Sequence, residues 1–354
     1  MRLLDRYIGR HVLGAVLVVL LIIVALDTLF GFVAQLESMR ANYQMAEVLE
    51  YTLLTIPKRI YQFIPFSAMI GCLVGLGALA SNSELAVMRA AGVSLTRILF
   101  AVLKPTLLLI CVGLAIGEYV APLTEQLADS GRAIARSGDG KQSFSQQGLW
   151  HREGDEFMRF NAVEPNGKLH GVTRMKFNKQ RELLESSFAE QAIYQGDHWV
   201  LQNLTLNKFE DGQITTVTLP RLEWKTSLSR ELLNVVVVKP DDLAIQGLHT
   251  YVAYLKAQGL NAGEYELAFW RKVMQPLAVI ALVLIGISFI FGPLRTVTMG
   301  LRVFTGVVVG LMFSILQDLL GPSSLVFGFH PLFAILAPIV ICIVIGSALL
   351  RRAG

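Results

Sequence analysis

Basic residues stand beside several apolar stretches of this chain, where they could bind an anion. Two of them, Arg132 and Arg136, are one helical turn apart. The full set is Arg40, Lys58, Arg59, Arg132, Arg136, Arg271 and Lys272. Charge-assisted hydrogen bonds from such side chains to phosphate contribute about 1.5–3 kcal/mol each. The alternative is that each side chain snorkels, with its aliphatic part among apolar groups and its charge in water, or forms a local ion pair. For the set as a whole we favour an anion site.

Two acidic residues fall within apolar stretches. Asp27 lies in the first stretch, and Asp318, beside Gln317, lies in the fifth. A carboxylate at the centre of a membrane costs about 2.5–3.5 kcal/mol on insertion scales, so such a residue usually faces a cavity or a partner. Both acids could instead lie near the ends of their helices, where this cost falls. We take Asp27, Asp318 and two aromatic residues, Phe32 and Phe66, as candidate cavity or gate residues.

A short polar loop at residues 81–92 has the pattern of an isolated helix. Ser81 and Glu84 match a capping box, and Gly92 suits the position just after a helix end. We expect the apolar side chains between them, Leu85 and Met88 among them, to be exposed to the cytoplasm or to a partner. A helix this short is not stable alone in water, so something must pack on it. Partner docking and a helix lying on the membrane surface remain equal alternatives.

Motifs for catalysis and metal binding are absent from the sequence. The closest approach to a Walker A loop, at residues 138–142, lacks its spacing and its Ser or Thr. There is no H-E-x-x-H or G-x-S-x-G motif, and the six histidines show no metal-ligand spacing. The three cysteines lie in apolar stretches, where we expect them to pack as small hydrophobic groups. We therefore expect no cofactor, no metal and no ATPase activity of the chain's own.

The composition indicates a membrane protein. Of 354 residues, 53% are hydrophobic and only 16% are charged, whereas soluble chains carry about 25% charged residues. The mean hydropathy is +0.53. This composition therefore argues against an ordinary soluble enzyme and against a disordered chain.

Six stretches are long and apolar enough to cross a bilayer as helices. They cover approximately residues 12–34, 60–80, 98–121, 269–291, 298–320 and 331–350. The first follows three arginines, but it is longer than the apolar core of a cleaved signal peptide and no cleavage pattern follows it. We therefore expect it to remain as a membrane span.

The charges in the short loops predict the orientation of these spans. One side would hold most of the basic residues: Arg2, Arg6, Arg10, Arg89, Arg97, Lys104, Arg295, Arg302, Arg351 and Arg352. The other side would hold only Arg40, Lys58 and Arg59. Both termini and the 81–92 loop are then cytoplasmic, and the long segment between spans three and four lies on the outer side.

That segment, residues 125–245, differs from the rest of the chain. It is polar, with turn patterns such as Asn166-Gly167 and Asp211-Gly212 separating short alternating runs. This spacing is typical of an antiparallel β sandwich or jellyroll. Residues 241–268 return to a helical pattern. We predict three parts: a membrane half with spans one to three at 1–124, the β domain at 125–245, and a connecting helix with spans four to six at 246–354.

Several stretches resemble the LptF/LptG permease family of the lipopolysaccharide exporter. They are LDRYIG at residues 4–9, SELAVM at 83–88, GEYVAP at 117–122, QGLW at 147–150, LHTYV at 248–252 and FIFGPLR at 289–295. The likeness extends over essentially the whole chain in the right order. It implies an α-helical membrane protein with six transmembrane helices (3+3) and an inserted periplasmic antiparallel β-jellyroll, in the inner membrane of a Gram-negative bacterium.

The resemblance also implies partners and roles. The permease would pair with LptF, two LptB subunits would hydrolyse ATP, and LptC would join through a single helix. Lipopolysaccharide would enter a cavity from the outer leaflet and pass to the β domains and a periplasmic bridge. Glu84, Leu85, Met88 and Arg89 would lie on the coupling helix that contacts LptB.

The same resemblance implies that the outer cations face the phosphates of lipid A. Of these, Lys58, Arg132 and Arg136 best match basic positions of the family. Family members carry lysines at the outer end of the first span, whereas residues 31–38 have none here and only Arg40 is near.

Three other functions remain as alternatives. A permease for another lipid or for lipoproteins is one, although lipoprotein permeases resemble four-span proteins with the soluble domain after the first span. An ion-coupled secondary transporter is another, for which Asp27 and Asp318 are the only candidate ion-coupling residues. A structural membrane protein is the third.

Overall fold

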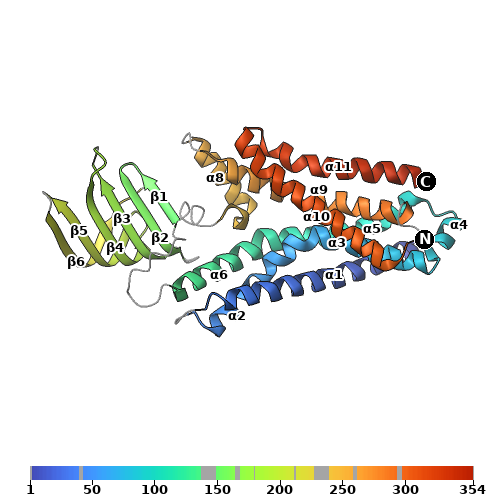
Figure 1. The fold of residues 1–354 in the computed structure, drawn as a ribbon, viewed down its shortest axis with the longest axis horizontal. Helices are drawn as coiled ribbons and strands as arrows, with labels where there is room; N and C mark the ends of the chain where they lie inside the picture. The colour runs from blue at the N-terminus through green and yellow to red at the C-terminus, as the bar shows by residue number, and fades with distance from the viewer. Residues whose placement is uncertain are drawn as a thin grey trace. The chain divides into compact units, whose positions relative to one another are not determined.

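A computed structural model describes residues 2–39, 43–136, 149–163, 168–178, 180–210, 213–226, 239–257, 261–292 and 297–353. The chain divides into two compact units (Figure 1). The helical unit comprises 1–30, 56–121 and 244–354, and the second unit comprises 31–55 and 122–243. Each unit is described by itself below.

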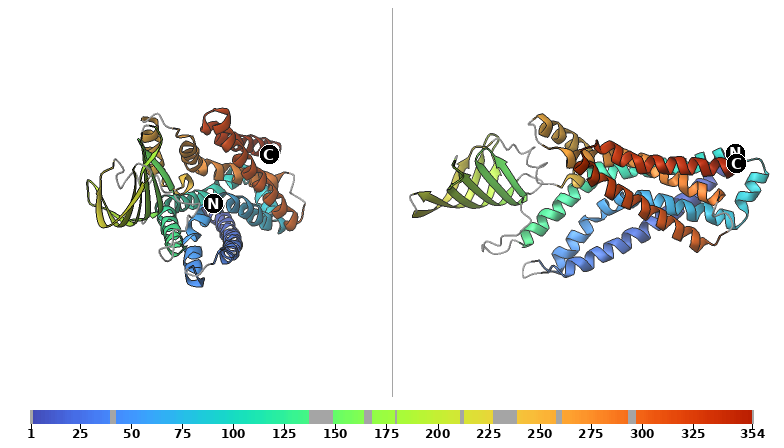
Figure 2. Two further views of the ribbon diagram at one scale, coloured as in Figure 1. Left: turned by 60° about the vertical axis from the view of Figure 1, so that its left-hand side comes forward. Right: turned by 45° about the horizontal axis from the view of Figure 1, so that its top comes forward.

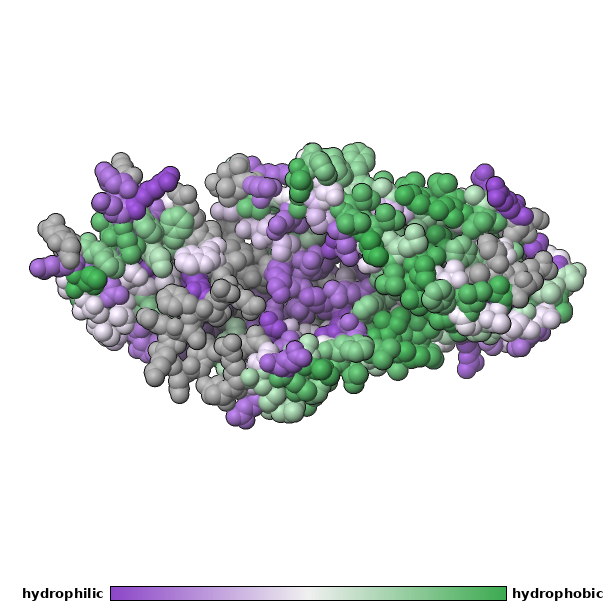
Figure 3. All heavy atoms as spheres, in the orientation of Figure 1, coloured by the Kyte–Doolittle hydropathy of each residue, from purple (hydrophilic) through white to green (hydrophobic). Residues whose placement is uncertain are grey.

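Long helices account for most of the chain. In order they are α1 (Arg2–Leu36), α2 (Met45–Leu54), α3 (Ile56–Ser81), α4 (Glu84–Ala90), α5 (Leu95–Ala115), the π-helix η1 (Ile116–Val120), α6 (Ala121–Arg136), the 3-10 helix η2 (Pro240–Asp242), α8 (Ile245–Ala257), α9 (Gly263–Phe291), α10 (Met299–Phe327) and α11 (Pro331–Ala353). Six helical segments are long and apolar enough to cross a membrane. The predicted six spans are therefore confirmed, and on the face drawn in Figure 3 apolar residues cover much of the helical unit.

The third membrane segment is longer than its apolar pattern predicts. The prediction ends it at residue 121, but α5, η1 and α6 form one continuous segment from Leu95 to Ala135. Pro122 lacks an N–H donor and would normally break an α-helix. Here Pro122 is the second residue of α6, just beyond the wider π-helical turn of η1, which changes the hydrogen-bond register at that point. The polar residues of α6 thus continue the helix beyond the apolar stretch.

Helix α3 is the most enclosed of the spans, because glycines let its neighbours approach closely. A methyl group at Gly71 would lie 2.4 Å from the Cα of Val16 on α1, and one at Gly75 would lie 2.9 Å from the Cα of Val12. In lipid, helices associate mainly by van der Waals contact, so small residues spaced four apart favour close packing. The same spacing recurs on α10, where Gly306 and Gly310 both lie against side chains of α3.

The β domain is a sheet of six antiparallel strands in sequential order, each paired with the next. The strands are β1 (Leu149–Glu153), β2 (Glu156–Val163), β3 (Leu169–Phe177), β4 (Leu183–Tyr194), β5 (Trp199–Glu210) and β6 (Gln213–Trp224). The sheet is visibly curved (Figure 2). One face buries an apolar cluster that includes Phe160, Trp199 and Leu201. The predicted antiparallel β domain is confirmed. A jellyroll also needs pairs between strands distant in sequence, and that finer topology stays a prediction.

Both chain termini and helix α4 lie at one end of the helical unit (Figures 1 and 2). Six spans return the chain to the side on which it starts. Helix α8 follows the β domain along the chain, in the region predicted to be helical, and its buried face consists of Leu248, Tyr251 and Leu255.

Filling the contact between α1 and α3 should destabilise the helical unit. In Gly71→Leu the new side chain meets backbone atoms, which cannot move aside cheaply, so we expect a loss of about 3 kcal/mol or more. The matched control is Gly14→Leu, because Gly14 has no atom within 4 Å of a Cβ. Thermal unfolding in detergent micelles should show a lower midpoint for Gly71→Leu alone. Equal midpoints for both variants would contradict this packing.

Candidate functional site

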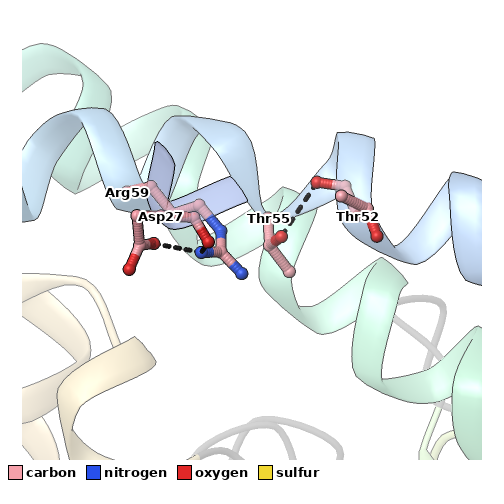
Figure 4. Close-up of polar contacts among 4 residues, drawn as sticks. All are labelled: Asp27, Thr52, Thr55 and Arg59. Atoms are coloured by element: carbon pink, nitrogen blue, oxygen red, sulfur yellow. Dashed lines mark hydrogen bonds and ion pairs between the residues drawn. The ribbon is translucent and has the colours of Figure 1, made fainter. Parts of the chain in front are cut away.

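The acid in the first span is paired with one of the cations before the second span. The Arg59 guanidinium on α3 forms an ion pair with the Asp27 carboxylate on α1 (Figure 4). It also donates a hydrogen bond to the backbone oxygen of Asp27 at 2.8 Å. The Arg59 side chain is 17% exposed and that of Asp27 is 40% exposed. This pair offsets the cost of placing a carboxylate in an apolar helix.

The second acid in a span also faces a cation of the same set. Asp318 of α10 lies 3.8 Å from Arg271 of α9, and its side chain is 69% exposed. Ser314, one turn earlier, is 3.5 Å from the other carboxylate oxygen. The structure thus brings together two groups of residues that the sequence suggests separately. Each of the two acids within spans forms an ion pair with one of the predicted cations on another helix.

Aromatic rings hold two further cations. Lys272 of α9 is only 8% exposed, and its ammonium lies 5.8 Å from the centre of the Tyr61 ring on α3. In the second unit, the Arg132 guanidinium of α6 lies 4.8 Å from the Tyr51 ring of α2. A cation over an aromatic face is stabilised by about 0.5–2 kcal/mol. Arg132 remains partly exposed, so it stays available to an anion, whereas Lys272 is enclosed.

An aromatic cluster of the helical unit lies beside Arg271. Trp270, next to Arg271, makes an edge contact with His330, and His330 makes one with Phe333. Such rings are typical of the interface between lipid and water. Arg271 and Lys272, eight and nine residues after the first residue of α9, therefore lie next to a ring of the kind found at the level of lipid head groups.

The remaining predicted site residues differ in exposure and packing, and two of them are not fully described. Lys58 lies on α3 and is partly exposed. Phe66 packs against α10, where a methyl group at Gly310 would lie 2.9 Å from its ring. Phe32 is partly exposed on α1. Arg136 is the last residue of α6, and its side chain is outside the described part. Arg40 lies outside the described residues.

Two predictions about the 81–92 loop are wrong in detail. Ser83, with φ +61°, precedes helix α4, while Ser81 ends α3 and its hydroxyl donates to the backbone carbonyl of Ala78 in the same helix. There is thus no capping box at Ser81. Leu85 is only 4% exposed because α4 folds back onto the apolar core of the spans, where Met88 also packs.

Other features of α4 agree with the prediction. Gly92 has φ +86° directly after the helix, as expected for its position. Val87 is 67% exposed, so one side of the helix is open. The core that packs on α4 belongs to this chain itself.

Two contacts join the start of α1 to the elements around α4. The Tyr7 hydroxyl donates to the Glu84 carboxylate at 2.8 Å. Two residues earlier, Asp5 accepts from Arg97 of α5 at 3.1 Å. The apolar and charge patterns did not suggest either contact, because its partners are far apart in sequence. A movement of α4 would therefore act directly on the first span.

Sequence reasoning also missed two polar residues with a structural role. Glu118, in the π-helix η1, accepts from the backbone N–H of Ile245 at 2.7 Å and so caps the start of α8. A π-helical turn often marks a functional position. Arg302 was counted only among the cations of the side that holds the termini, but it is 3% exposed and donates to the Gly77 carbonyl of α3 at 2.7 Å.

Three carboxylates of the second unit lie close together. Oxygens of Glu125, Asp129 and Asp242 are within 4.8 Å of one another. Hard cations prefer such ligands, but Glu125 and Asp242 also interact with other groups of the chain. We assign no metal to this cluster.

Comparison with known proteins agrees with these features. A model of the lipopolysaccharide export system permease LptF/LptG matches residues 6–352. This chain belongs to the LptF/LptG permease family. It is 39% identical over 353 residues to the lipopolysaccharide export system permease protein LptG of Escherichia coli K12, covering 99% of this chain and 98% of that protein. It is 38% identical over 352 residues to LptG of Haemophilus influenzae, with the same coverage. LptF/LptG family membership and the six apolar helices indicate an inner-membrane protein.

The Asp27–Arg59 pair should couple more strongly than the Arg271–Asp318 pair. A double-mutant cycle of Asp27→Asn and Arg59→Gln should give about 1–3 kcal/mol, because these side chains are in contact and partly buried. The same cycle with Arg271→Gln and Asp318→Asn is the control and should give about 0.5 kcal/mol, since that pair is longer and more exposed. Reversible unfolding in mixed micelles measures both. Equal coupling energies for the two pairs would contradict the closer contact that we describe between Asp27 and Arg59.

Proposed function

We propose that this chain is the transmembrane permease subunit that exports lipopolysaccharide from the inner membrane toward the outer membrane. The observation that supports this most is the family match over residues 6–352, which includes all six spans and the β domain. The substrate enters from the periplasmic leaflet and leaves through the β domain toward a periplasmic bridge. Both termini and α4 are cytoplasmic, and the β domain at 125–245 is periplasmic.

Lipid A carries phosphates, and the cations near the outer ends of the spans suit them chemically. Lys58 and Arg132 are partly exposed, so they are the first contacts. Arg271 is 3.8 Å from Asp318, and a phosphate can compete for it. Lys272, under Tyr61, needs a movement of α3 against α9 before it contacts substrate. Arg40 and Arg136 complete the proposed set.

The energy for extraction comes from outside this chain. Each buried methylene is worth about 0.8 kcal/mol, so withdrawing one acyl chain of roughly 14 carbons from lipid costs about 10 kcal/mol. Lipid A has several such chains. A cavity lined by apolar side chains must rebury them, and its closure must expel them. We assign the ATP hydrolysis to LptB, and the other half of the cavity to LptF.

Helix α4 transmits the movement of the ATPase. Its exposed side, including Val87 and Arg89, docks on LptB, and its buried side is anchored by Leu85. Glu84 bonds to Tyr7 of α1, so displacement of α4 pulls on the first span. LptC adds its single helix beside that span.

An ion-coupled secondary transporter has less support. Asp27 and Asp318 are the acids that could bind a coupling ion, and each is ion-paired with an arginine. The arginine therefore already occupies the carboxylate that would have to bind the ion. We therefore keep the ATP-driven permease.

Removing the Glu84 carboxylate should uncouple the chain from its ATPase. In Glu84→Ala, α4 loses its bond to α1, and we expect at least a fivefold loss of LptB copurification and of lipopolysaccharide export. Ser81→Ala is the control, because among the described residues the Ser81 hydroxyl bonds to Ala78 of its own helix α3. Affinity purification and an export assay in cells measure both effects. If Glu84→Ala kept both at the control level, Glu84 would have no coupling role.

A further inference from the structure

A second group of cations surrounds an open pocket at the other end of the helical unit, where both termini lie. The pocket has a volume of about 560 Å³ and lies between the start of α1 and the first half of α5. Its lining is basic and apolar, with a single acid: Asp5, Arg6, Gly9, Arg10, Leu13, Ala101, Lys104 and Pro105. This volume is in the range of pockets that bind small molecules, about 300–1,000 Å³.

Close packing of the two helices forms the floor of the pocket. A methyl group at Gly9 would lie 3.3 Å from the Ala101 carbonyl oxygen and 3.6 Å from the Pro105 ring. The two helices run in the same direction and in register, since Asp5 meets Arg97 and Gly9 meets Ala101. Arg10, the residue after Gly9, and Lys104, three residues after Ala101, therefore line the pocket from the two different helices.

The charge of the pocket is unbalanced. Asp5, its only acid, already accepts from Arg97 at 3.1 Å. Among the described residues, no ion pair or hydrogen bond engages the side chains of Arg6, Arg10 or Lys104, and all three are exposed. Lys104 is nine residues after Leu95, which is about 13 Å along the helix. A cation at this depth in a span is costly unless an anion accompanies it.

The apolar part of the lining continues along the same two helices. Leu13 lies beside the cations, and one turn further Leu17 and Leu108 are 50% and 59% exposed. A ligand that joins an anionic head to an apolar tail matches this order of charge and hydrocarbon. Free phosphate would satisfy the cations but would leave the leucines exposed.

We propose that this pocket binds the phosphate head group of an anionic phospholipid from the leaflet in which the termini lie. Arg6, Arg10 and Lys104 contact the phosphate, and an acyl chain lies along Leu17 and Leu108. Basic pockets between helices on the cytoplasmic side bind such head groups in other membrane proteins. The assignment to the cytoplasmic leaflet depends on the orientation proposed above, but the site itself does not depend on lipopolysaccharide transport.

Native mass spectrometry of the full chain tests this directly. The purified protein is exposed to equimolar phosphatidylglycerol and phosphatidylcholine with identical acyl chains, without ATP or lipopolysaccharide. Wild type should retain phosphatidylglycerol preferentially. Because each cation near a membrane surface contributes about 1 kcal/mol, Lys104→Gln and Arg10→Gln should each lower the retained ratio about fivefold. The control is Arg351→Gln with Arg352→Gln, two exposed cations at the end of α11.

Three results separate the outcomes. Loss of preference in the pocket variants and not in the control supports the site. An unchanged ratio in both folded pocket variants overturns it. If excess inorganic phosphate displaces phosphatidylglycerol as well as added phosphatidylglycerol does, the pocket takes free phosphate and the lipid assignment is wrong. None of these results bears on export, so the two proposals fail independently.

Discussion

Close contact around α3 is the physical constraint on which the rest of the helical unit depends. In lipid there is little hydrophobic force between helices, so they hold together by surfaces that fit. Gly71 and Gly75 of α3 admit α1, and glycines of α5, η1 and α10 admit side chains of α3 such as Ile64 and Tyr61. Because α3 is enclosed on several sides, the helices around it are positioned relative to one another through it.

Helix α1 is the neighbour that joins both ends of this arrangement. Tyr7 contacts Glu84 of α4 near its start, and Asp27, 20 residues later, pairs with Arg59 of α3. At 1.5 Å per residue these contacts are about 30 Å apart, the thickness of a hydrocarbon core. A rigid helix between two polar contacts can transmit a displacement of α4 to the other end of the spans, where the candidate phosphate-binding residues Lys58 and Arg271 lie. This connection is the structural basis of the coupling that we propose.

Features that depend on composition and period could be predicted from the sequence, and contacts between distant residues could not. Six spans follow from apolar length, and the β domain follows from alternation and turns. The sequence also suggests Asp27, Asp318 and the outer cations as special, but only the fold shows that Asp27 faces Arg59. The exposure of Leu85 was predicted wrongly because a helical pattern does not say which neighbour covers it. The extent of the third span was missed because its polar end, α6, has no apolar pattern.

Site-specific photo-crosslinking to lipopolysaccharide in cells tests the central claim most directly. A crosslinking residue at Phe66 or Phe32 probes the membrane segments, and one at Trp150 or Phe160 probes the β domain. We expect adducts in both regions with ATP, and loss of the β-domain adducts after ATP depletion, because passage to that domain needs ATP. A folded and assembled protein that forms adducts at none of these positions would contradict export of lipopolysaccharide through this chain.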